Sequence, residues 1–158
     1  MNALDIRGLT QAHSNSLLTA TGAETVHDTT VRLDFSIRGK MYSKSGTNAD
    51  QVTPTTDANT AAAITLAANQ LRVVVWCYNA SGAVKVAAGD VVSWDGTVAT
   101  PMPSFPNIPN DLCPFAYQVL KGASNASTIT FGTSNWNATG FTNTIVNVSQ
   151  LPDAPQTS

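Results

Sequence analysis

Residues 71–78 read LRVVVWCY, an almost unbroken run of apolar, β-branched and aromatic side chains. A run of this kind is typical of a strand that is buried on both faces. Residues 79–82, Asn-Ala-Ser-Gly, have the composition of a turn, and residues 83–87 read AVKVA. The stretch therefore predicts a hairpin at the centre of a β-sheet.

Prolines follow this hairpin and interrupt the sheet. Residues 90–94 and 97–99 predict a second hairpin around an Asp-Gly turn. The segment after it contains Pro101, Pro103, Pro106, Pro109 and Pro114. Because proline lacks the backbone N–H that a sheet interior needs, this segment is predicted to be irregular. Residues 115–120, FAYQVL, then resume the sheet.

Short strands are also predicted on either side of this block. Residues 31–38 alternate apolar and polar side chains, and Gly39-Lys40 turns them back into Met41-Tyr42. The last predicted strands are residues 128–131 and 141–148. Seven to nine short strands separated by turns predict an all-β chain, folded as an antiparallel, jelly-roll-like β-sandwich.

Residues 43–60 are predicted to form a loop. They are rich in Thr, Asn, Asp and Ser and contain Pro54, which leaves no room for a strand. Residues 57–63 read DANTAAA, so Asp57 can cap a short helix of at most two turns. The sequence thus predicts one long loop and one short helix between the flanking strands.

A length of 158 residues is typical of a single domain. We expect residues 1–30 to form an extended N-terminal arm, and residues 31–158 to form the β-sandwich domain with a proline-rich C-terminal tail. The apolar side chains of the arm are too sparse for a core of their own. They are candidates for contact with a partner or a second copy: Leu4, Ile6, Leu9, Leu17 and Leu18.

Charge is scarce in this chain. Only 11% of the residues are charged, where about 25% is usual, and the formal net charge is −2. A nucleic-acid partner, which requires a basic patch, is therefore not expected. Residues 122–152 carry no charged side chain at all. Such a segment either forms a solvated Thr- and Asn-rich face or meets another protein.

Two features bear on the compartment. No apolar run approaches the ~20 residues that a membrane-spanning helix needs, so no membrane contact is expected. The first residues, MNALD, lack the features of a secretory signal, and synthesis in a cytoplasm is expected.

Cys77 and Cys113 fit no metal or redox motif. Packed free thiols are favoured over a disulfide, which a reducing compartment opposes.

The sequence predicts no catalytic, metal or cofactor site. His13 and His27 are the only histidines, and no GxSxG motif accompanies the serines. His27 and Asp28 are adjacent, so in a strand their side chains would point to opposite faces and could not share a metal. Asp50 and Asp57 lie in predicted loop, where a turn or capping role is usual.

Aromatic side chains can stack on a sugar ring or anchor a protein contact. Trp76 and Tyr117 lie in apolar strand patterns and are predicted to be core residues. Trp136, flanked by Asn135 and Asn137 in a predicted loop, is the aromatic residue best placed to contact a glycan or a protein.

Several motifs occur in a specific order along residues 31–156. The first are GKMY at 39–42, PTTDANT at 54–60, AANQ at 67–70 and the Val-rich strand that ends at Trp76. Later come LCPFAY at 112–117, Phe131-Gly132, SNWNATG at 134–140 and LPDAPQ at 151–156. In this order they resemble small structural proteins of tailed bacteriophages and prophages.

The resemblance implies a virion component with a β-sandwich fold, of the head decoration or cement type, with no catalytic residues and no cofactor. The implied partner is the major capsid protein on the outside of the head, after synthesis in the host bacterial cytoplasm. We also expect a homo-oligomer, a trimer in preference to a dimer, because decoration sites lie on three-fold or two-fold axes. The arm would then lie across a neighbouring subunit or the coat protein. The alternative is a tail- or head-fibre module that binds host-surface glycan.

Overall fold

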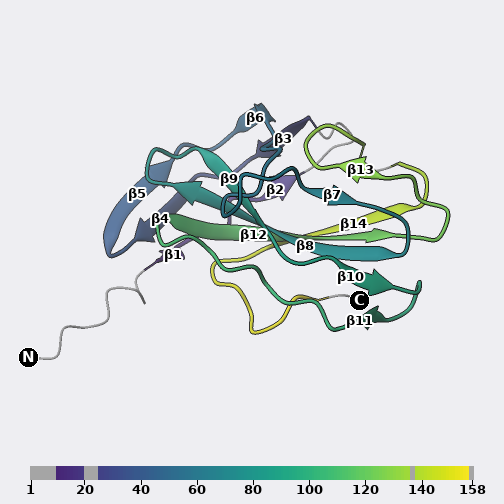
Figure 1. Cartoon of the computed structure of the whole chain (residues 1–158). Helices are drawn as coiled ribbons and strands as arrows, with labels where there is room; N and C mark the ends of the chain where they lie inside the picture. The colour runs from purple at the N-terminus through teal and green to yellow at the C-terminus, as the bar shows by residue number, and fades with distance from the viewer. Residues whose placement is uncertain (1–9, 20–24, 136–137, 157–158) are drawn as a thin grey trace, which may run out of the picture.

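The computed structural model describes residues 10–19, 25–135 and 138–156 of the chain (Figure 1). Within these residues the protein is all-β, with fourteen strands and no helix. Every pairing between strands is antiparallel, and the strands form several separate sheets. The all-β, antiparallel class predicted from the sequence is therefore confirmed.

The largest sheet contains the two apolar strands that dominate the sequence. Its order is β11-β10-β8-β12-β14, and β9 pairs with the part of β8 that β10 leaves open. The central hairpin and the second hairpin are thus both confirmed. The strand bounds are β8 Gln70–Asn79, β9 Val84–Ala88, β10 Val92–Trp94, β11 Ala99–Thr100, β12 Leu112–Gly122 and β14 Phe141–Asn147.

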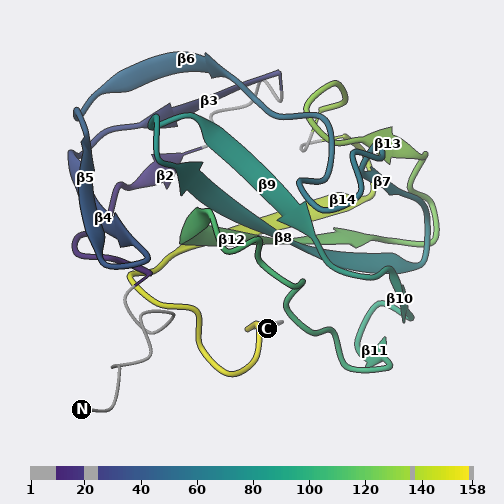
Figure 2. The ribbon, with the colours of Figure 1, turned by 60° about the vertical axis from the view of Figure 1, so that its left-hand side comes forward.

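Three smaller sheets pack on one face of this main sheet (Figure 2). One has the order β1-β4-β5, with β1 Gln11–Ala12, β4 Leu33–Ile37 and β5 Lys40–Lys44. Another has the order β2-β3-β6, with β2 Leu18–Thr19, β3 Val26–Thr29 and β6 Asn48–Val52. The third pairs β7 Thr65–Leu66 with β13 Ile129–Thr130.

Aromatic rings fill the space between the main sheet and the smaller sheets. The Tyr78 ring stacks on Phe115 at 4.4 Å between centroids and on Phe35 of β4 at 5.6 Å. Trp76 lies 5.5 Å from Phe131, and all five side chains are buried. Large aromatic side chains contribute most of the buried area of such a core, so these rings fix the smaller sheets on the main sheet.

The opposite face of the main sheet is covered by irregular chain. Val73, Val75 and Tyr117 on this face pack with residues of the proline-rich segment, such as Ile108, and with Leu151 of the C-terminal tail. The segment between β11 and β12 and the tail both run along this side (Figure 2). The prolines therefore form a cover over a buried strand, which explains why β8 is apolar on both faces.

The two cysteines are free and lie on opposite faces of the main sheet. Cys113 is paired with Tyr78 across the ladder, whereas Cys77 is paired with Pro114. Because residues paired across a ladder point to the same face and neighbours along a strand alternate, the two thiols point apart. Burial raises the pKa of both thiols. Packed free thiols were expected, and the structure has them.

The predicted short helix at residues 57–63 is wrong. Asp57 does cap this segment: its carboxylate accepts hydrogen bonds from the Thr60 backbone N–H at 3.0 Å and from the Thr60 hydroxyl at 2.7 Å. Its other oxygen accepts the Ala88 N–H at 3.0 Å, which ties the turn to β9. Ala61 then takes a φ of 58°, and a left-handed residue ends any helix there.

The prediction of a strandless loop over residues 43–60 is also wrong. β5 runs to Lys44, and β6, Asn48–Val52, pairs with β3. Four of the five β6 residues are exposed, and Val52 is 81% exposed. An edge strand with both faces in solvent shows no alternation of apolar and polar residues, so the sequence pattern could not reveal it.

The described part of residues 1–30 belongs to the folded domain. β1 pairs with β4, β2 with β3 and β3 with β6, and Leu18 is 2% exposed. Leu17 is 44% exposed, whereas Leu4, Ile6 and Leu9 lie outside the described residues. Residues 10–19 and 25–30 are thus strands and turns of the domain and do not form an extended arm.

Candidate interaction site

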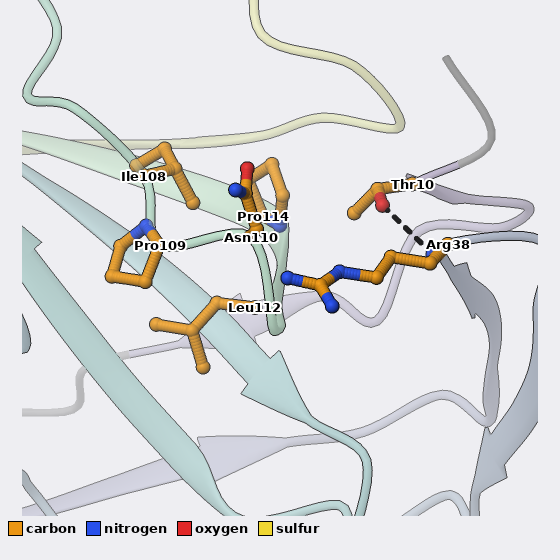
Figure 3. A pocket seen from close by; sticks show the side chains of 7 residues that line it. All are labelled: Thr10, Arg38, Ile108, Pro109, Asn110, Leu112 and Pro114. Carbon is orange, nitrogen blue, oxygen red and sulfur yellow. Dashed lines mark hydrogen bonds between the residues drawn. The ribbon is translucent and has the colours of Figure 1, made fainter. Parts of the chain in front are cut away.

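A pocket of about 600 Å³ lies where the β4–β5 turn meets the proline-rich segment that enters β12 (Figure 3). Two residues come from the N-terminal part of the chain, three from the segment leading into β12 and two from the start of β12 itself. The lining residues are Thr10, Arg38, Ile108, Pro109, Asn110, Leu112 and Pro114. We call it the Arg38 pocket.

The backbone at Arg38 is held in an unusual conformation. Arg38 and Gly39 are the two central residues of the β4–β5 turn, with φ angles of 51° and 78°. Positive φ at both positions is typical of a tight hairpin turn in which Asn or Gly usually comes first. The Arg38 backbone N–H donates a hydrogen bond to the Thr10 hydroxyl at 3.0 Å. The turn therefore places an arginine where a smaller residue would be less strained.

The guanidinium group of Arg38 extends across the pocket towards Asn110 and Leu112 (Figure 3). Among the described residues the one salt bridge joins Arg32 to Asp34, so Arg38 has no carboxylate within 4.0 Å there. Asp111, the acidic residue next to the pocket wall, lines a different cavity. The pocket therefore holds a cation without an anionic partner from the described chain.

The wall of the pocket that faces the Arg38 side chain is largely apolar. It is made by Ile108, Pro109, Leu112 and Pro114, and the Leu112 N–H donates to the Pro109 carbonyl at 3.0 Å, which closes the turn before β12. Leu112 is buried, whereas the Asn110 amide is exposed. The site thus combines one guanidinium, one amide and one hydroxyl with a rigid apolar surface.

The hairpin that carries Arg38 is the most basic part of this charge-poor chain. Residues 32–44 contain four of the eight Lys and Arg residues and a single acidic one, a local net charge of +3. Arg38 and Lys40 are both exposed at the turn, and the Lys40 ammonium lies 5.5 Å from the Tyr42 ring centroid. This end of the hairpin produces a positive potential next to the pocket.

A second cavity, of about 410 Å³, lies between β6 and the β8–β9 turn. Its wall is about half polar and half apolar, and the polar part includes Thr29, Asn48, Gln51 and Ser81 together with Lys44. Hydroxyl and amide side chains of this kind are suited to hydrogen bonding with neutral polar groups.

The second cavity also contains His27, which is 2% exposed and whose ring lies 5.1 Å from that of Trp76. Its Nδ1 is 3.5 Å from the Thr53 hydroxyl, and Nε2 has no hydrogen-bond partner among the described residues. Burial lowers the pKa of His27 to about 4, against a smaller opposing effect of Asp28. The imidazole is therefore neutral at physiological pH.

Of the sequence-predicted contact residues, those that the structure describes, Leu17, Leu18 and Asn135, do not line the Arg38 pocket, and Leu4, Ile6 and Leu9 lie outside the described residues. Asn135 is exposed and its carbonyl accepts the Ala138 N–H at 3.0 Å, while Trp136 and Asn137 lie outside the described residues. Leu17 is exposed at another place on the surface. The role of Arg38 was not predicted from the sequence. The local signal for it is weak: an Arg-Gly pair stands in a hairpin turn where Asn-Gly is the usual pair.

Two further findings concern metal binding and membrane-spanning helices. Across residues 10–19, 25–135 and 138–156, no group of three or more His, Cys, Asp or Glu side chains is placed to hold a metal ion. In the same residues no helix is long and apolar enough to cross a membrane.

Comparison of the chain with protein-family models, with curated proteins and with solved structures gave no match. The resemblance to phage structural proteins therefore stays a prediction from sequence motifs.

Proposed function

We propose that the chain is a non-catalytic structural protein of a phage virion, a decoration or cement protein with a jelly-roll-like sandwich fold. It binds the outside of an assembled head and bridges neighbouring subunits of the major capsid protein. The observation that carries the proposal is the cationic end of the β4–β5 hairpin beside the Arg38 pocket, where Arg38 is exposed and has no carboxylate partner among the described residues, in a chain otherwise poor in charge. Such a combination favours contact with an oppositely charged protein surface.

A decoration protein stabilises a shell by mass action. It binds the assembled lattice and not the free coat protein, so each bound copy shifts the equilibrium towards the closed shell. Many weak contacts add up over the lattice. The uncharged segment 122–152, which includes β14, supplies further surface for contact with coat subunits or other copies.

Cosedimentation with empty heads tests this proposal. Purified protein mixed with heads lacking it should sediment with them in a saturable manner, and decorated heads should resist heat or chelation better than bare ones. Free coat protein is the control and should not bind. Absence of saturable binding to empty heads would contradict the proposal.

The alternative is a host-adsorption module that binds surface glycan. The second cavity favours it, because its hydroxyl and amide side chains suit a sugar. A glycan array separates the two functions. Binding to a defined glycan that is lost on Asn48→Ala, combined with no affinity for empty heads, would reverse the order of the two proposals.

A further inference from the structure

We propose that the Arg38 pocket receives an extended acidic segment of the partner protein, with one Asp or Glu carboxylate on the Arg38 guanidinium and an adjacent apolar side chain on the proline and leucine wall. The inference deepens the proposed function and rests on it for the source of the segment, the coat protein.

The chemistry of the cation selects a carboxylate. A guanidinium presents a planar fork of N–H donors that matches the two oxygens of a carboxylate. Thr10 uses its hydroxyl to hold the Arg38 backbone, so the side chain is presented by a fixed turn. The exposed Asn110 amide lies on the same pocket and adds a second hydrogen-bonding group beside the anion. A carboxylate thus meets a guanidinium that projects from a fixed turn, with a second hydrogen-bonding group beside it.

The walls select a peptide segment over a small anion. Ile108, Pro109, Leu112 and Pro114 offer apolar surface that an inorganic ion cannot use. The positive charge also continues along the hairpin to Lys40, beyond the pocket itself. A segment several residues long satisfies both features, because its acidic side chain and its apolar side chain contact different parts of the same site.

The strained turn supports a binding role for this arginine. A non-glycine residue at a φ of 51° costs free energy that Asn or Gly would largely avoid. Strain of this kind clusters at active sites and ligand clamps, although the described part of the chain also has it at five other non-glycine residues, Leu17 among them. The arginine has no ionic contact with the described residues that would compensate for the strain, so an external carboxylate is the consistent partner.

Two blocked tetrapeptides, LPEL and LPQL, test the site directly. They differ only in the carboxylate, and their binding can be followed by NMR through the backbone amides of Thr10, Arg38, Asn110 and Leu112. LPEL should shift these signals in a saturable manner, whereas LPQL and inorganic phosphate should bind about tenfold more weakly or not at all. Equal shifts with LPEL and LPQL, or equal shifts with phosphate, would overturn the inference.

Substitutions distinguish binding of the peptide in the pocket from attraction by the overall positive charge of the hairpin. Arg38→Gln removes the guanidinium charge but leaves a polar side chain and the same backbone strain, and it should weaken LPEL binding about tenfold or more. Arg32→Gln is the matched control, because Arg32 belongs to the same hairpin but is already paired with Asp34 outside the pocket. LPEL affinity that is unchanged by Arg38→Gln would overturn the inference.

Empty heads distinguish failure of this inference from failure of the proposed function. Arg38→Glu should reduce binding to heads about tenfold or more, and Arg32→Glu should not. Full binding of the Arg38→Glu variant would overturn the role of the pocket while the decoration function stands. Binding of LPEL without any binding to heads would support the carboxylate pocket while the decoration function falls.

Discussion

At residue 38 the backbone conformation favours asparagine or glycine, whereas the proposed binding role requires arginine. Arg38→Asn should stabilise the fold by about 0.5–1 kcal/mol, because asparagine adopts a positive φ at lower cost than arginine. Urea unfolding measures the change. The same variant should lose LPEL binding. Arg32→Asn, the control on the same hairpin, should give no gain in stability, and a loss of stability in Arg38→Asn would contradict the account of the turn.

His27 makes stability depend on pH. Its pKa is lowered by burial to about 4 in the folded protein, while the ordinary value in an unfolded chain is about 6.5. Between these values the unfolded chain binds the proton and the folded chain does not. The free energy of unfolding is therefore at its full value above about pH 6.5 and falls as the pH drops towards 4, by about 3 kcal/mol.

Urea unfolding at pH 7, 5.5 and 4.5 checks this dependence. His27→Gln should be less stable at pH 7 but should lose much of the slope between pH 6.5 and 4. His13→Gln, a change at the exposed histidine, should keep the slope of the unmodified protein. Equal slopes in the His27→Gln variant and the unmodified protein would show that another group controls the transition.

At the scale of single elements, Leu17 and Leu18 test whether β2 belongs to the fold. Leu18→Ala removes a side chain that is 2% exposed and should lower the free energy of unfolding by about 2–4 kcal/mol. Leu17→Ala changes a neighbour that is 44% exposed and should cost about 0.5 kcal/mol or less. Two equally small effects would mean that β2 is a detachable strap, as the sequence had suggested for the arm.

The elements that could be predicted from the sequence are those whose pattern of apolar and polar residues reflects how they are buried. β8 is apolar on both faces because the smaller sheets cover one side and the proline-rich segment covers the other. β6 has an exposed pattern, and only its pairing with β3 makes it a strand. Residues 57–63 have helix-forming alanines, but the contact of Asp57 with Ala88 of β9 determines a turn. Long-range contacts of this kind leave no local trace in sequence.

The Arg38 pocket could not be predicted for the same reason. Thr10, Arg38 and Asn110 are far apart in the chain, and only the folded arrangement of β4, β5 and the proline-rich segment brings them together. The one local signal was the Arg-Gly turn. By contrast, the scarcity of charge, which makes the basic hairpin conspicuous, is visible in the sequence alone.

At the scale of the whole molecule, we expect self-association. An uncharged segment from residue 122 to 152 is suited to contact with another copy, and closed symmetry repeats such a contact once per subunit. Light scattering should therefore give about three times the 16.5 kDa mass of the chain, since a trimer is favoured over a dimer. A monomer at all concentrations, both free and on heads, would contradict this expectation.

The number of copies per virion decides whether the chain is a decoration protein. Quantitative mass spectrometry of purified particles gives the ratio of this chain to the major capsid protein. A decoration protein that follows the symmetry of the shell should be present in tens to hundreds of copies, at a fixed ratio to the coat. A count of about a dozen or fewer, as expected for a tail or fibre component, would contradict the account.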